Sequence, residues 1–149
     1  ALLNCGGTHR PEWFHRKLGD ILYEGCGVAR DEAGLLDALT KVRELREEFW
    51  RDVKVVGTGN RLNQELEKAG RVADFIELGE VMILDALDRR ESAGAHFRNE
   101  YATEAGEAKR NDGDWCAVSA WETRPDGTKV RHSEPLSFSL IDLQVRDYR

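Results

Sequence analysis

The chain has 149 residues, enough for one domain with a core of its own, and it is 40% hydrophobic and 34% charged, with a formal net charge of -6. This acidic balance argues against nucleic acid as the main partner, because phosphate binding needs an excess of Lys and Arg on one face. No apolar run approaches the roughly 20 residues of a membrane-spanning helix. The N-terminus lacks the basic start and apolar core of a signal peptide, and it lacks an initiator Met. We therefore expect a piece of a longer protein without a membrane span.

Three amphipathic helical patterns come first along the chain. The first begins at Pro11, which a helix start tolerates, and ends near Gly25. The second begins after Asp31, a good N-cap. The third runs from about residue 60 to residue 90, with apolar residues at spacings of three and four. Helices of this kind bury their apolar stripes against each other, so residues 1–100 are predicted to form an antiparallel, spectrin-repeat-like three-helix bundle in a mainly α protein.

A different pattern follows the bundle. Residues 104–114 read as a charged loop that contains glycine, and residues 115–123 alternate as a strand. The turn at 124–127, Arg-Pro-Asp-Gly, leads to a second strand at about 128–133. The region 101–149 is therefore predicted to hold a β-hairpin and an extended C-terminal tail. Because an isolated hairpin is only marginally stable, we expect this region to pack on the bundle or on a partner.

The stretch VKVVGTGNRLNQ resembles the start of a dinucleotide-binding unit. A β-branched run precedes Gly57 and Gly59, and a helical pattern follows. The fingerprint needs a third glycine where this chain has Leu62, and it needs further parallel strands where the flanking segments here are helical. A loop between two helices is the favoured interpretation.

The cysteines and histidines of the first 26 residues raise the question of a zinc site. Cys5, His9, His15 and Cys26 are four residue types that bind zinc, but their spacings match no common zinc module. With Cys116 the chain has three cysteines and no CxxC pair, which is typical of reduced cytosolic thiols. No metal ligand is assigned.

Residues 89–101, RRESAGAHFRNEY, are the strongest candidate for a functional site in the sequence. The third helical pattern ends there, and Glu91, His96, Arg98 and Tyr101 follow within eleven residues. A His beside an Arg is able to bind or protonate a carboxylate, so one hypothesis is a small enzyme with His96 as its acid or base. No Ser, Cys or Asp makes a convincing nucleophile–base pair with His96, however. A His and an Arg after a helix more often bond backbone carbonyls and fix a loop.

Long segments of the chain are similar to a known family. LNQELEKAGRVADFIELGEVMILDALDRRESAGAHFRNEY, DWCAVSAWE and EPLSFSLIDLQVRDYR resemble the C-terminal region of the succinate dehydrogenase/fumarate reductase flavoprotein subunit, in the bacterial form with a long tail. The resemblance runs from about Thr8 to Arg149. It implies a parent subunit that interconverts succinate and fumarate with covalently attached FAD and passes electrons to an iron–sulfur subunit. That parent complex is expected on the cytoplasmic, inner face of the cell membrane, held there peripherally.

The resemblance also says which functions this chain lacks. The family's FAD fingerprint, its flavin-linked His, and the residues that hold the dicarboxylate lie in upstream domains, and none of their motifs occurs here. We therefore assign this chain no catalytic, cofactor-binding or metal-binding residue, and we expect FAD only in the parent subunit.

Contact with other parts of the parent complex is the function that remains. The expected partners are the flavin domain of the same subunit, the iron–sulfur subunit and a flavinylation factor, and the alternative is a free-standing helical protein–protein interaction module. By resemblance, the His-x-Arg of His96 and Arg98 is a packing and docking element. The predicted interface residues are Arg89, Arg90, Glu91, His96, Arg98, Tyr101, Trp115 and Trp121, the tryptophans because aromatic residues dominate buried interface anchors.

Overall fold

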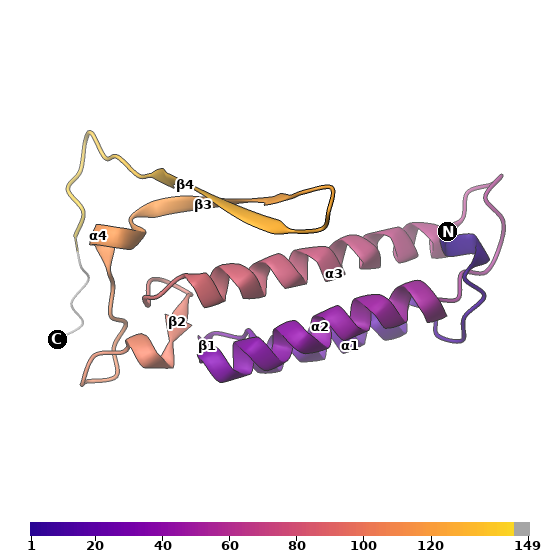
Figure 1. The fold of residues 1–149 in the computed structure, drawn as a ribbon, viewed down its shortest axis with the longest axis horizontal. Coiled ribbons are helices and arrows are strands. Elements are labelled where there is room, and N and C mark those ends of the chain that lie inside the picture. The colour runs from indigo at the N-terminus through magenta and orange to yellow at the C-terminus, as the bar shows by residue number, and fades with distance from the viewer. Residues whose placement is uncertain (145–149) are drawn as a thin grey trace. The chain divides into compact units, whose positions relative to one another are not determined.

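Three long helices lie side by side in the computed structural model, which describes residues 1–144 (Figure 1). They are α1 (Pro11–Gly25), α2 (Glu32–Asp52) and α3 (Gln64–Asp88), and each packs against the other two. Successive helices run in opposite directions, which confirms the predicted antiparallel bundle. Within residues 1–144, no helix is both long and apolar enough to cross a membrane.

The helix starts follow from their capping residues. The Asp31 carboxylate accepts a hydrogen bond from the Gly34 amide at 2.8 Å, as predicted for the start of α2. Helix α3 starts at Gln64, later than the predicted residue 60, because Asn63 is its N-cap and accepts from the Leu66 amide at 3.1 Å. The residues before Asn63 therefore belong to the loop between α2 and α3.

The core of the bundle is aromatic at one end and aliphatic along its length. The Phe14 and Phe49 rings meet edge to face, with centroids 5.2 Å apart. Glycine sets how closely α1 and α2 approach, because a Cβ on Gly25 would lie 2.5 Å from the Ala38 Cβ. The largest fully buried apolar side chains are those of Phe14, Phe49, Leu35, Leu45, Ile76, Ile83, Val42 and Val53.

One charged side chain lies in the contact between α2 and α3. Glu80 is only 3% exposed, and it accepts hydrogen bonds from Arg43 Nε at 2.7 Å and from Arg46 Nη1 at 2.5 Å. Burial acts to raise the pKa of Glu80, but the hydrogen bonds and charges of the two arginines outweigh burial and lower it. The carboxylate is therefore ionised, and its two ion pairs link α3 to α2.

The segment before α1 is held against the end of α2. The Asp52 carboxylate accepts from the Thr8 amide at 3.0 Å and from the Thr8 hydroxyl at 2.7 Å, and it pairs with His9 Nδ1 at 2.5 Å. Hydrogen bonds from His9 and then Thr8 lower the pKa of Asp52 to about 2. Gly7 passes so close that a Cβ would overlap the Asp52 carbonyl oxygen. This approach therefore requires glycine.

Short elements complete the first compact unit, which comprises Ala1–Arg110. Two strands of two residues each form a parallel pair that the sequence analysis did not predict, with Ala29 opposite Phe97. Because these strands are far apart in the sequence, their pairing ties the start of α2 to the segment that follows α3. The short elements are the 3-10 helices η1 (Leu2–Asn4) and η2 (Asn99–Tyr101) and the strands β1 (Ala29–Arg30) and β2 (Phe97–Arg98).

The second unit, Asn111–Arg149, holds the predicted hairpin. Strand β3 (Ala117–Thr123) pairs antiparallel with β4 (Lys129–Pro135). The Gly127 amide donates to the Arg124 carbonyl at 2.9 Å, and Gly127 has a φ of 84°, as the turn chemistry requires. Trp115 is not part of the strand as predicted, because it ends the short helix α4 (Asp112–Trp115).

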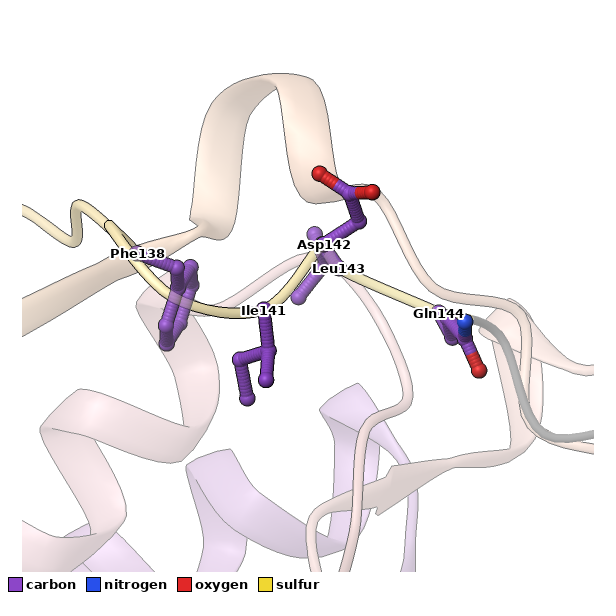
Figure 2. Close-up of a pocket in the computed structure, with 5 residues that line it drawn as sticks. All are labelled: Phe138, Ile141, Asp142, Leu143 and Gln144. Atoms are coloured by element: carbon purple, nitrogen blue, oxygen red, sulfur yellow. The ribbon is translucent and has the colours of Figure 1, made fainter.

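The described part of the tail after β4, residues 136–144, forms no helix or strand, bends at residues 139–141 and is rich in exposed apolar side chains. Phe138 and Ile141 project to one side of the backbone and the Asp142 carboxylate to the other (Figure 2). These residues line a pocket with Leu143 and Gln144, and Asp142 is the only ionisable side chain among the five. These five described residues therefore offer no acid–base pair. The predicted extended tail continues over residues 145–149, which lie outside the described residues.

Candidate docking site at the end of helix α3

Arg98 caps the C-terminus of α3. Its Nη1 donates to the carbonyl oxygens of Ala86 at 2.8 Å and Leu87 at 3.3 Å, two groups of the last helical turn. A cation at this position also complements the negative end of the helix dipole. Arg98 is only 2% exposed, so its guanidinium is held inside the unit.

Glu100 connects Arg98 to the start of α2. One carboxylate oxygen accepts from Arg98 Nε at 3.1 Å, and the other accepts from the Glu32 amide at 2.5 Å, the first residue of α2. Burial acts to raise the pKa of Glu100, but the bonds from the Glu32 amide and from Arg98 lower it overall. The pair of Arg98 and Glu100 thus places a cation at the negative end of one helix and an anion at the positive end of another.

His96 closes a turn immediately beyond α3. Its Nε2 lies 3.0 Å from the Arg89 carbonyl oxygen, and because a carbonyl only accepts, Nε2 carries the proton. The backbones of Ala93 and His96 exchange two hydrogen bonds, of 2.8 and 3.1 Å, and Gly94 supplies the φ of 59° that this turn needs.

The environment of His96 disfavours its charged form. Burial lowers the pKa of the imidazole most, and the positive charges of Arg30, Arg89 and Arg98 lower it further. The hydrogen bond to the Arg89 carbonyl acts in the opposite direction, but the net shift is downward. His96 is therefore a neutral side chain that holds a loop.

Two buried polar residues complete the loop. Glu91, 2% exposed, accepts from Arg89 Nε at 2.9 Å. The Ser92 hydroxyl donates to the Arg98 carbonyl at 3.1 Å and accepts from the Arg98 amide at 2.8 Å. The Ser92 amide donates to the carbonyl of Lys109 at 2.9 Å. These bonds make residues 89–101 an ordered cap on the bundle.

The six predicted interface residues of this stretch differ in how far their side chains are buried. Arg90 is exposed, whereas Glu91 and Arg98 are buried and bonded within the unit. The half-buried residues are Arg89, His96 and Tyr101, and the Arg98 guanidinium lies 5.5 Å from the centre of the Tyr101 ring. The structure thus brings the six together, with an accessible part formed by the exposed and half-buried members.

Two participants in this site were missing from the predicted set. Arg30 reaches it because β1 pairs with β2, and its Nη2 donates to the Ala95 carbonyl at 3.4 Å. Glu100 reaches it as a cap on α2. Arg30 and the Ala95 carbonyl are separated by more than 60 residues, so no local sequence pattern indicates their contact.

The two predicted tryptophans lie in the second unit. Trp115 stacks with Arg131, whose guanidinium lies 4.9 Å from the ring centre, and Trp121 lies opposite Arg131 in the ladder of β3 and β4. Both rings are half-buried. Their role in an interface stays a prediction.

The glycine-rich stretch does not fit a dinucleotide cofactor such as FAD. Gly57 and Gly59 lie in the loop between α2 and α3, and the fingerprint requires a parallel strand there. The Asn63 amide nitrogen fills this loop by donating to the carbonyls of Val56 at 3.0 Å and Thr58 at 3.2 Å. The loop is therefore closed by its own side chain.

The four residues considered as zinc ligands each contact a different neighbour. Cys5 Sγ donates to the Trp50 carbonyl, His9 pairs with Asp52, His15 stacks on Phe75, and Cys26 Sγ accepts from Arg30. Over residues 1–144, no group of three or more His, Cys, Asp or Glu residues is placed to hold a metal ion.

Comparisons with known proteins give one consistent result. The model of the family described as "Fumarate reductase flavoprotein C-term" matches residues 15–148. The succinate dehydrogenase flavoprotein subunit of Bacillus subtilis is 27% identical over 148 residues, 99% of this chain and 24% of that protein. The fumarate reductase flavoprotein subunit of Escherichia coli is 31% identical over 97 residues, 65% of this chain and 16% of that protein.

Solved structures show the same fold. The flavoprotein of Escherichia coli quinol fumarate reductase matches with a TM-score of 0.80 and 25% identity, over 95% of this chain and 23% of that one. Mycobacterium smegmatis Sdh1 matches with a TM-score of 0.70 and 22% identity, over 92% of this chain and 23% of that one. The chain thus spans about a quarter or less of the length of these relatives.

Proposed function

This chain belongs to the fumarate reductase flavoprotein C-terminal family, and from this premise we propose that it is the C-terminal helical domain of a succinate dehydrogenase or fumarate reductase flavoprotein subunit. The match over residues 15–148 carries the proposal, together with the relatives' greater length. The parent subunit would bind FAD, interconvert succinate and fumarate, and pass electrons to an iron–sulfur subunit. Its complex would sit peripherally on the inner face of the cell membrane.

In this proposal the chain braces the flavin domain and docks to the iron–sulfur subunit or a flavinylation factor. The hydrogen-bonded end of α3 supports a docking role, because its buried polar groups hold the loop and leave Arg90 exposed. Arg89, His96 and Tyr101 lie half-buried next to it. We assign direct contact to these four residues, and we assign Glu91 and Arg98 the role of shaping the surface.

The chemistry is assigned to the rest of the parent subunit. His96 is neutral and bonded to a backbone carbonyl, so it holds a loop and is not placed as a proton donor to a substrate. Under this proposal the isolated chain binds no flavin and turns over no succinate. A yellow purified sample with a flavin absorbance band would contradict it.

A chimera tests the docking role. The segment of the Bacillus subtilis subunit that aligns with this chain is replaced by this chain, and the product is expressed with the other subunits of that complex. We expect covalent flavin and copurification of the iron–sulfur subunit. The same chimera with Arg90→Ala should bind that subunit more weakly, since rim charges mainly speed association. Exposed Arg71, which pairs with Glu67 on α3, supplies the matched control Arg71→Ala.

Two outcomes would count against the proposal. A folded chimera that takes up flavin but does not bind the iron–sulfur subunit rejects docking through this chain. Equal weakening by Arg90→Ala and Arg71→Ala rejects the end of α3 as the contact surface. A reading frame of about 149 codons would instead favour the free-standing interaction module.

A further inference from the structure

Helix α3 carries more apolar side chains than the core of the bundle uses. Its core face includes Ile76 and Ile83, which are fully buried. Phe75, Leu78 and Met82 lie outside the core, and their exposed fractions are 40%, 55% and 47%. Because these three residues are spaced by three and four positions, they are neighbours on one face of the helix. We call this exposed apolar face the α3 stripe.

The other two long helices expose large apolar side chains only singly. On α2, Leu36 and Trp50 are separated by about four helical turns. On α1, Trp13 and Tyr23 are separated by about three turns. Single exposed apolar residues are ordinary on a soluble protein, whereas a contiguous apolar patch marks an interaction surface. Among the three helices, the α3 stripe is therefore the surface that indicates a docking partner.

The N-terminus lies at one end of α3. The 3-10 helix η1 packs on α3, and Figure 1 shows the N-terminus beside the first turns of that helix. The Asp52 carboxylate accepts from the Thr8 amide and hydroxyl, so the segment before α1 is held to the bundle. From Gln64, the first residue of α3, the stripe extends from about 17 Å to about 27 Å along the helix axis. The stripe is therefore close to the point at which an upstream chain would enter.

The relatives have most of their length outside the matched region. The chain covers 24% of the Bacillus subtilis subunit and 23% of the Escherichia coli flavoprotein, and the matching family is a C-terminal one. Under the proposed function, the remainder of the subunit joins this chain upstream of Ala1. A domain of several hundred residues has a radius of gyration of about 20 Å, so it reaches the stripe from that entry point. Residues 89–101 follow the opposite end of α3 and stay accessible to another subunit.

We propose that the α3 stripe is the surface through which the bundle packs on an apolar patch of the flavin domain of the same subunit. This inference rests on the proposed function and names the contact by which the chain braces that domain. A stripe of Phe, Leu and Met fits a permanent contact, because permanent interfaces are more apolar than transient ones and resemble a domain core. The charged and polar residues after α3 fit a contact between subunits.

Hydroxyl-radical footprinting with mass spectrometry tests the proposal, because oxidation of a side chain depends on its exposure. The free 149-residue chain is compared with the flavoprotein subunit of the Bacillus subtilis chimera, purified without the other subunits. Leu78 and Met82 should be oxidised about fivefold more slowly in the chimera, where the flavin domain covers them. Leu36 on α2 is the matched control, since it is 50% exposed against 55% for Leu78. It should be oxidised at the same rate in both proteins.

Three results would overturn the proposal. The first is equal oxidation of Leu78 in the free chain and the chimera. The second is protection that appears only after the iron–sulfur subunit is added, which would assign the stripe to that subunit. The third is protection that disappears on dilution, which would assign the stripe to a second copy of the chain.

The outcome is separable from that of the proposed function. If the chimera does not fold, the complete parent subunit of this chain replaces it in the same comparison. Covalent flavin and binding of the iron–sulfur subunit are measured independently of the footprint, so an unprotected stripe would leave the family assignment and the docking role standing. A protected stripe in a chimera that does not bind the iron–sulfur subunit would contradict docking but support this contact.

Discussion

The two units of this chain differ in how they exclude water. In Ala1–Arg110 three amphipathic helices surround a core of fully buried apolar side chains. Among residues 111–144 of the second unit, no residue is fully buried, and the hairpin depends on one ladder of backbone hydrogen bonds. A hydrophobic core is the main source of folding free energy, so we expect the first unit to be stable on its own and the second not to be.

Preparing the two units as separate chains should give the largest difference in folding between them. A chain of residues 1–110 should keep its helix content and unfold cooperatively, because its core is complete. A peptide of residues 111–149 should lose its hairpin, because two strands without a core are marginal in water. Circular dichroism and cross-strand nuclear Overhauser contacts between β3 and β4 measure both. A hairpin that persists in the isolated peptide would contradict this view of the second unit.

A smaller but still large effect is expected from Phe49→Ala in the bundle. Phe49 is fully buried, and its ring packs on Phe14. The substitution should lower the free energy of unfolding by about 3–5 kcal/mol, measured by chemical denaturation. Val118→Ala in β3 is the matched truncation in the second unit, and at this exposed position it should change that free energy by less than about 0.5 kcal/mol. Similar losses from the two variants would show that the units share one core.

The smallest effect on the free energy of unfolding is expected from Glu100, which caps the start of α2 and bonds Arg98. Glu100→Gln keeps an acceptor for the Glu32 amide but removes the charge at the start of α2 and its ion pair with Arg98, which together should cost about 0.5–1 kcal/mol near neutral pH. Since folding lowers the pKa of Glu100 from 4.5, the stabilisation is present above that value and is lost as the pH falls through the lowered pKa. The difference between the variant and the original chain should therefore vanish in acid.

Denaturation at several pH values measures this difference. Glu104→Gln removes an exposed carboxylate four residues away, and it should have little effect at any pH. A difference for Glu100→Gln that persists unchanged in acid would mean that the charge of Glu100 does not stabilise this contact between Arg98 and the start of α2.

The sequence indicated the bundle because helix periodicity and capping are local. Pro11 and Asp31 lie at the starts of α1 and α2 as predicted, and the turn that ends with Gly127 connects the two strands. Each of these signals depends on residues a few positions apart. The resemblance to the flavoprotein family was equally readable, because it rests on long contiguous segments.

Glu80 shows what a local pattern misses. It lies on the same face of α3 as Ile76 and Ile83, where a charged residue breaks the apolar stripe. Its burial is tolerated because Arg43 and Arg46 approach from α2. Which arginines face Glu80 depends on how the helices pack.

The stretch RRESAGAHFRNEY shows most clearly what the sequence determines and what only the tertiary structure decides. By itself the sequence determined that a helix ends there and that polar groups near its end need hydrogen-bond partners. Only the tertiary structure decided that Arg98 and Glu91 turn inward and that Arg90 stays exposed. The physical reason is that the fold decides which of several nearby groups each side chain bonds, and that it adds contacts from elsewhere in the chain: β1 brings Arg30, and the start of α2 supplies the amide that Glu100 caps.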